Sequence, residues 1–133
     1  MVSNKICIEH ELESKSANII WPVISTPEGL SHWVADEVKC TDGVFSFTWG
    51  NSWGHNETRT ATLLETRDFS HIRLRWNEDE YGEDTYLELK MEKGDITGDY
   101  ILLVTDFAPD GDVDSVRDIW SACFKKLRHS TGL

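Results

Sequence analysis

The fold of this chain is decided by the stretch Ile20-Trp21-Pro22-Val23-Ile24-Ser25-Thr26-Pro27-Glu28-Gly29-Leu30-Ser31-His32-Trp33. This stretch predicts two short helices that meet at a sharp corner. The hydroxyl of Thr26 can accept a hydrogen bond from a free main-chain N–H, and the ring of Pro27 already holds the helical φ angle. Glu28 places a carboxylate at the positive end of the helix dipole. One helix therefore ends before Pro27 and a second begins there.

The segments on both sides of this corner are predicted to be strands. Residues 5–13 alternate, with Ile6, Ile8, His10 and Leu12 sharing one face. From residue 37 onward, turn signals recur at hairpin spacing, and we expect five or six strands between them. Three of these strands carry apolar side chains on one face only, which is typical of a one-sided antiparallel sheet: Phe45, Phe47, Trp49, Ile72, Leu74, Trp76, Leu87, Leu89 and Met91. Residues 101–107 are apolar on both faces, so we expect a central, covered strand.

The chain ends in a predicted amphipathic helix that runs from Asp114 to His129 and is capped by Asp112 or Asp114. Its apolar residues form one broad face: Val116, Ile119, Trp120, Cys123, Phe124 and Leu127. The inner face of the sheet is the only apolar surface large enough to cover this helix. We therefore expect the helix to cross the concave side of the sheet, with Trp120 touching Phe47 or Trp76.

This order of elements resembles the helix-grip fold of the START-like (SRPBCC) superfamily. The pattern W-P-x-I-S-T-P-E-G-L-x-x-W over residues 21–33 is similar to the branch named for homology to the activator of the heat-shock-protein-90 ATPase. The resemblance implies an α+β fold of order β-α-α-β5/6-α, in which a curved antiparallel sheet wraps a long C-terminal helix in one domain, residues 1–133. Various members of the superfamily hold lipids, sterols, polyketides or hormones in an apolar cavity, whereas members of the heat-shock-activator branch often have no known ligand.

Composition excludes several classes of function. A net charge of −11 argues against nucleic acid and against anionic membrane surfaces, because both attract Lys- and Arg-rich proteins. The three cysteines, Cys7, Cys40 and Cys123, are widely spaced, and the histidines show no metal-ligand spacing, so we expect no disulfide, metal or cofactor. No segment has the pattern of a signal peptide or the length of a membrane span, and a cytoplasmic location is expected.

The candidate site residues are mostly aromatic. Six of them are predicted to converge between the sheet and the C-terminal helix: Phe45, Phe47, Trp49, Trp76, Trp120 and Phe124. Three others are expected at the mouth of the interior: Trp33, Trp53 and His55. His10 lies on the apolar face of the first strand, where a polar group needs a partner. It is either a core histidine with its hydrogen bond satisfied or the polar anchor of a ligand, with neighbouring hydroxyls from Thr58, Thr60 or Thr62.

The leading hypothesis is a domain that binds an apolar or aromatic small molecule, or a lipid, between the sheet and the C-terminal helix. The same aromatic side chains could instead fill the interior and leave no pocket. The alternative is a protein-interaction or chaperone-cofactor-like module without a ligand. A cyclase-like or dehydratase-like enzyme ranks last, because the sequence holds no recognisable catalytic motif and His10 is the one nominee.

Two observations discriminate between these hypotheses. A continuous cavity of about 300 Å³ or more would favour ligand binding. An apolar patch on the outer face of the sheet, around Tyr100, Leu102 or Val104, would favour protein interaction.

Overall fold

The fold is an α+β arrangement in which one sheet carries all three helices on its concave face. The computed structural model describes residues 3–50, 56–77 and 85–133, so Trp53 and His55 lie outside the described residues. The elements follow the order β1 (Ser3–Glu11), α1 (Ala17–Ser25), α2 (Pro27–Leu30), β2 (Glu37–Thr41), β3 (Val44–Gly50), β4 (Asn56–Arg67), β5 (His71–Trp76), β6 (Leu87–Lys93), β7 (Tyr100–Pro109) and α3 (Val113–Thr131). The predicted order of strand, two helices, strands and a C-terminal helix is confirmed, with six strands between α2 and α3.

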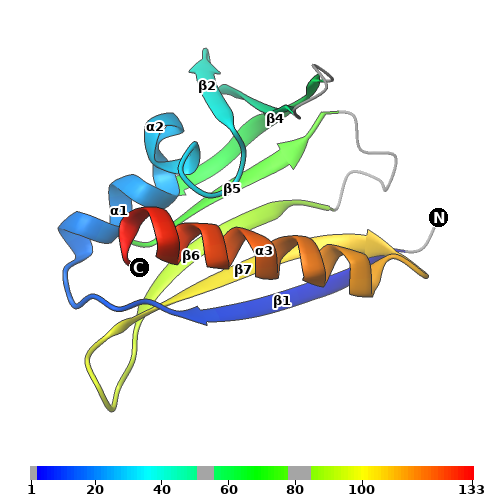
Figure 1. Cartoon of the computed structure of the whole chain (residues 1–133). Coiled ribbons are helices and arrows are strands. Elements are labelled where there is room, and N and C mark those ends of the chain that lie inside the picture. Colours follow the sequence, from blue (N-terminus) through cyan, green and yellow to red (C-terminus); the bar gives the residue numbers. More distant parts are fainter. Residues whose placement is uncertain (1–2, 51–55, 78–84) are drawn as a thin grey trace.

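The seven strands form a single antiparallel sheet with the order β1-β7-β6-β5-β4-β3-β2. Figure 1 shows α3 lying along this sheet, with α1 and α2 beside the C-terminal end of α3. The strands that α3 contacts most are β1 and β7, at one edge of the sheet. The helix therefore lies to one side of the concave face and leaves the other side, formed by β3 to β5, less covered.

The corner between α1 and α2 forms as the sequence predicts. The hydroxyl of Thr26 accepts a hydrogen bond from the N–H of Gly29 at 3.0 Å, and its own main-chain N–H donates to the carbonyl of Pro22 at 3.2 Å. A side chain on Gly29 would collide with the main chain at Pro22 and Val23, so glycine is what allows the two helices to pass so closely. This corner holds Trp33, whose indole N–H donates to the carbonyl of Val23 at 3.0 Å.

The predicted inner faces of β3, β5 and β6 are confirmed, because their apolar residues are buried under the helices or half-buried at the edge of that cover. From α3, the residues that complete this core are Trp120, Phe124 and Leu127. The sheet and the helices thus share one apolar interior, as helices packed on a one-sided sheet require.

Strand β7 differs from the prediction in its position in the sheet, and its orientation is one that the sequence left open. It lies second from the edge, between β1 and β6, whereas the central strand is β5. Leu102 and Val104 are fully buried and Tyr100 packs against the core, so these three residues do not form the outer apolar patch that would have favoured protein interaction. Alternation cannot orient a strand that is apolar on both faces. Its orientation comes from pairing, because Val104 lies opposite Ile8 of β1 and Leu89 of β6.

Candidate ligand-binding cavity

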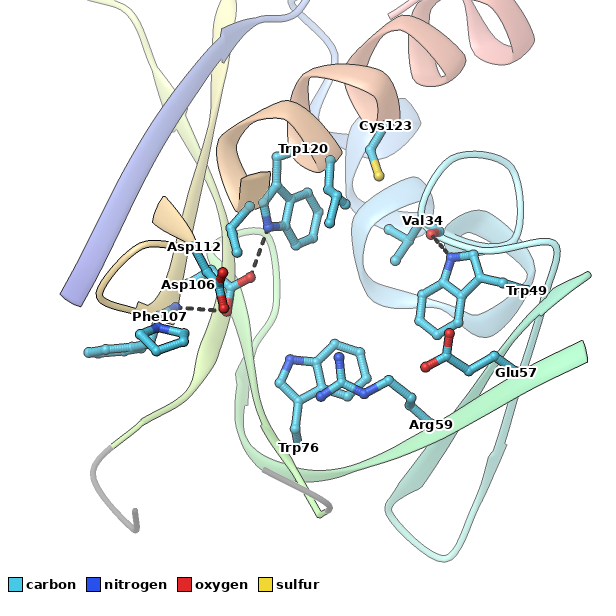
Figure 2. Close-up of a pocket in the computed structure, with 13 residues that line it drawn as sticks. Val34, Trp49, Glu57, Arg59, Trp76, Asp106, Phe107, Asp112, Trp120 and Cys123 are labelled. Carbon is cyan, nitrogen blue, oxygen red and sulfur yellow. Dashed lines mark hydrogen bonds between the residues drawn. The ribbon is translucent and has the colours of Figure 1, made fainter. Parts of the chain in front are cut away.

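A cavity of about 500 Å³ lies between the N-terminal half of α3 and the ends of strands β3, β4, β5 and β7. Figure 2 shows Trp120 on the helix side of this cavity and Trp49 and Trp76 on the sheet side. Charged groups complete its walls, Glu57, Arg59, Asp106 and Asp112, together with the thiol of Cys123. The cavity is partly open to solvent, because Ile119 on its rim is 60% exposed.

The cavity exists because Trp120 does not reach the sheet at β3 and β5. Among the described residues, the ring of Trp120 pairs with that of Trp33, at 6.1 Å between ring centroids, and not with Phe47 or Trp76 as predicted. Trp76 lies on the opposite wall (Figure 2). Since α3 packs mainly on β1 and β7, its N-terminal half stands away from the uncovered strands, and a gap of ligand size remains.

The candidate aromatic residues separate into two groups, one on each side of this gap. The helix-side stack consists of His10, Phe124, Trp33 and Trp120, whose successive ring centroids are 4.8, 6.4 and 6.1 Å apart. The sheet-side stack consists of Phe45, Phe47, Trp49 and Trp76, whose neighbouring centroids are 5.2 to 6.5 Å apart. Such distances are normal for attractive aromatic pairs. Each stack therefore supports itself without the other.

Three of the candidate residues line the cavity: Trp49, Trp76 and Trp120. The prediction that Trp33 lies at the mouth is wrong, because its side chain is 1% exposed and lies behind Trp120. Phe45, Phe47 and Phe124 are likewise buried. These residues form the layer that holds the cavity walls in place.

Hydrogen bonds fix the orientation of two of the three cavity tryptophans. The indole N–H of Trp120 donates to a carboxylate oxygen of Asp106 at 2.9 Å, and the other oxygen of Asp106 accepts from the N–H of Phe107 at 2.8 Å. The indole N–H of Trp49 donates to the carbonyl of Val34 at 3.0 Å. The rings of Trp120 and Trp49 are therefore already held in place before any ligand arrives.

Strand β4 contributes the charged residues that the sequence analysis missed. Phe47 pairs with Arg59 and Phe45 with Ala61, so the odd-numbered residues of β4 face the interior up to the register shift after Leu63. The expected hydroxyls of Thr58, Thr60 and Thr62 are on the other face. The Oγ1 of Thr58 lies 3.0 Å from that of Thr48, while Thr60 and Thr62 hydrogen-bond Asn77. The pairing of β4 with the aromatic face of β3 is the information that would have identified Arg59 as an inward-facing residue.

Arg59 lies against the aromatic floor of the cavity. Its guanidinium carbon is 4.3 Å from the ring centroid of Trp76, a cation–π distance (Figure 2). The stem of Arg59 thus packs on the sheet while its N–H groups remain at the cavity wall. This residue brings a positive charge into a site that the aromatic pattern alone predicted to be apolar.

His10 lies at the far end of the helix-side stack and does not line the cavity. Its Nε2 donates to the main-chain oxygen of Leu133 at 3.2 Å, and its ring stacks on Phe124. Burial lowers the pKa of His10 below its ordinary value of 6.5, while the hydrogen bond to Leu133 opposes the shift. Leu133, which follows α3, therefore supplies the hydrogen-bond partner that the sequence analysis expected for His10. The position of His10, away from the cavity, does not support a role as ligand anchor.

Cys123 lines the cavity, and its sulfur points into the gap (Figure 2). Burial raises the pKa of the Cys123 thiol to about 11, with a smaller opposing effect from the charge of Lys126. The thiol is neutral at physiological pH and acts as an apolar wall residue. Among the described residues, no three His, Cys, Asp or Glu side chains gather closely enough to hold a metal ion.

The curved seven-stranded sheet, the helix along it and the cavity between them define a helix-grip protein. The chain belongs to the START-like superfamily, because the family model of the START-like superfamily domain matches residues 2–133. The superfamily assignment made from residues 21–33 and from the order of elements is thereby confirmed.

Solved structures give the same picture. BfR322 from Bacteroides fragilis is 40% identical, with 97% of this chain and 91% of that protein covered and a TM-score of 0.62. The AHSA1-like protein from Aeromonas hydrophila is 12% identical, covers 96% and 91% of the two chains, and has a TM-score of 0.75. The Aha1 dimer from Colwellia psychrerythraea is 14% identical, with 98% and 96% covered and a TM-score of 0.70. At 12% and 14% identity, the last two comparisons show a shared fold alone. Among curated proteins, none matches this chain.

Membrane insertion through a helix is not indicated for the described part of the chain, where no helix has the length and apolar character to cross a bilayer.

Proposed function

We propose that this protein binds an apolar or aromatic small molecule, or a lipid chain, in the cavity between α3 and the sheet. The observation that carries the proposal is the cavity of about 500 Å³ bounded by Trp49, Trp76 and Trp120. Ligand pockets have volumes of roughly 300 to 1,000 Å³ and are lined mainly by apolar and aromatic groups with a few polar ones.

The energetics favour a flat, apolar ligand. Burying apolar surface contributes roughly 25 cal/mol per Å², and indole rings offer large faces for it. The rings of Trp49 and Trp120 are fixed by hydrogen bonds, so binding costs little additional side-chain entropy. The layer of buried aromatic residues behind each wall keeps the cavity from collapsing when it is empty.

The test uses the neutral fluorophore N-phenyl-1-naphthylamine with the full chain. We expect saturable binding, a rise in fluorophore emission and a shift of the Trp120 indole N–H signal in NMR spectra. Replacing Val116 on the cavity wall by tryptophan, Val116→Trp, fills the space and should abolish binding. Ser115→Trp introduces the same side chain at an exposed neighbouring position outside the cavity and should leave binding intact.

Absence of saturable binding, with the Trp120 signal unmoved, would remove the proposal. The interaction module without a ligand would then take its place. Binding that survives Val116→Trp but not Ser115→Trp would place the fluorophore elsewhere on the protein. Non-denaturing mass spectrometry of the purified protein adds a direct search for a molecule that remains bound.

A further inference from the structure

Among the described residues that line the cavity, Arg59 is the one cation. A guanidinium has five N–H donors, and within the described part of the chain Arg59 makes no hydrogen bond or salt bridge, only its contact with the ring of Trp76. Other half-buried arginines of this sheet differ. Arg73, on the opposite face, donates twice to Glu88 at 2.6 and 3.0 Å. Arg59 is thus a half-buried cation at a cavity wall that offers donors without an acceptor.

The carboxylates of the cavity do not serve as that acceptor. Both oxygens of Asp106 accept hydrogen bonds from its neighbours Trp120 and Phe107. Glu57 and Asp112 are exposed on the rim, where water satisfies their charge. The acidic groups are therefore either engaged or solvated, and Arg59 is the charged group left for an incoming ligand.

We infer that the ligand carries an anionic group of the carboxylate class, which pairs with Arg59 while its apolar body lies against Trp120 and Trp49. This inference rests on the proposed function. Arg59 already covers the ring face of Trp76, so a ligand cation would meet a like charge there, whereas a carboxylate matches the planar donors of the guanidinium. The protein's net charge of −11 repels anions in general, so selection of an acid must come from this local pairing.

Three probes of one shape test the inference: 2-naphthoate, the neutral 2-naphthamide and the cationic 2-naphthylmethylammonium. Calorimetry at pH 7.5 should show naphthoate binding about tenfold more tightly than naphthamide, because a charge-assisted hydrogen bond stabilises the complex more than a neutral one does. Arg59→Gln should lower the affinity for naphthoate about tenfold and leave that for naphthamide within about twofold. Arg59→Lys keeps the charge without the planar fork and should restore part of the preference.

Arg67→Gln is the matched control, because it removes the same charge from an exposed position on the same strand, away from the cavity. It should leave all three affinities unchanged. Equal affinities for naphthoate and naphthamide, tighter binding of the cation, or an unchanged naphthoate affinity in Arg59→Gln would overturn the inference while the proposed function stands. Failure of all three probes to bind would overturn the inference, and failure of N-phenyl-1-naphthylamine as well would overturn both. Naphthamide binding to the Arg59→Gln variant verifies that the variant is folded.

Discussion

The two halves of α3 face different surroundings although both carry an apolar stripe. The C-terminal half is sealed: Phe124 and Leu127 are buried, and Ser130 donates to the carbonyl of His32 beside α2 at 3.0 Å. An ion pair of Arg128 with Glu13, at 3.1 Å, closes the end toward β1. The N-terminal half is open, because Val116 and Ile119 border the cavity.

This difference shows that an aromatic stack becomes part of the closed core where helices cover it. The number of aromatic side chains does not decide this. Both stacks contain four rings at similar spacing. The helix-side stack is closed because the α1–α2 corner carries Trp33 into it. In the sheet-side stack, Trp49 and Trp76 face the cavity, with the N-terminal half of α3 on its other side.

The largest expected effect comes from breaking the sealed half. Trp33→Ala should lower the free energy of unfolding by about 3–5 kcal/mol, the usual cost of deleting a large buried aromatic side chain. The loss includes its contacts with both Trp120 and Phe124. Urea denaturation followed by circular dichroism measures it. Trp21→Ala, a half-buried tryptophan of the same corner, is the matched control and should cost less. Equal losses would show that the helix-side stack is no better packed than the surface.

Cys123 lies at the border between the two halves, where its reactivity reports how well the border is closed. With the pKa raised from 9.0 to about 11, its thiolate is about 100-fold scarcer at pH 8 than that of an ordinary cysteine. Iodoacetamide should therefore label Cys123 about 100-fold more slowly than an ordinary exposed thiol, as followed by peptide mass spectrometry. Exposed Cys7 and Cys40 serve as internal standards. Labelling of Cys123 at their rate in the native protein would show that water reaches this border freely.

The fold was predictable where alternation or capping is unambiguous. Thr26 and Pro27 start α2 through a capping hydrogen bond and a fixed φ angle, which depend on local sequence alone. The alternating aromatic residues of β3 likewise identify its inner face. The phase of β4 was not predictable, because Thr58 and Arg59 are both polar and only pairing with Phe47 shows which faces inward. The same holds for β7, whose two faces are equally apolar.

The candidate site was predictable as a set of rings but not as a cavity. Alternation places Trp49 and Trp76 on the inner face, yet whether a helix covers them depends on the position of α3 across the sheet. That position follows from the packing of α3 on β1, β7 and the α1–α2 corner, which is long-range information. Trp33 illustrates the same point. Its place after a helix end predicts an exposed side chain, but the corner between α1 and α2 directs it into the interior, where it is buried.

The open half should respond in binding more than in stability. Trp76→Ala removes a half-buried ring of the sheet-side stack, so its cost in unfolding free energy should be about 1–2 kcal/mol, below that of Trp33→Ala. The affinity for N-phenyl-1-naphthylamine should fall about tenfold, because one wall of the cavity is lost. Fluorescence titration measures it, with Trp21→Ala as a control outside the cavity. A loss of stability as large as that of Trp33→Ala would mean that Trp76 is as much a part of the core as Trp33.

The smallest effect is the pH dependence that His10 gives to the sealed end. Its folded-state pKa is lowered by burial and by the charge of Arg128, while the hydrogen bond to Leu133 and the carboxylates of Glu11 and Glu13 oppose this. The unfolded chain therefore binds the proton more readily. This group's contribution to stability is full above about pH 6.5, and it is lost as the pH falls from that value through the lowered folded pKa.

His10→Phe keeps a ring against Phe124 and removes the titrating group, so the stability of the variant should fall less than that of the wild type between pH 7.5 and pH 5.5. Urea denaturation at the two pH values gives the difference, and NMR titration of the His10 ring gives the pKa itself. The other four histidines are common to both proteins and cancel in the comparison. If His10 titrates at or above 6.5, or if both proteins lose the same stability, the end of the helix-side stack is open to water, and the contrast between the two halves of α3 ends at Phe124.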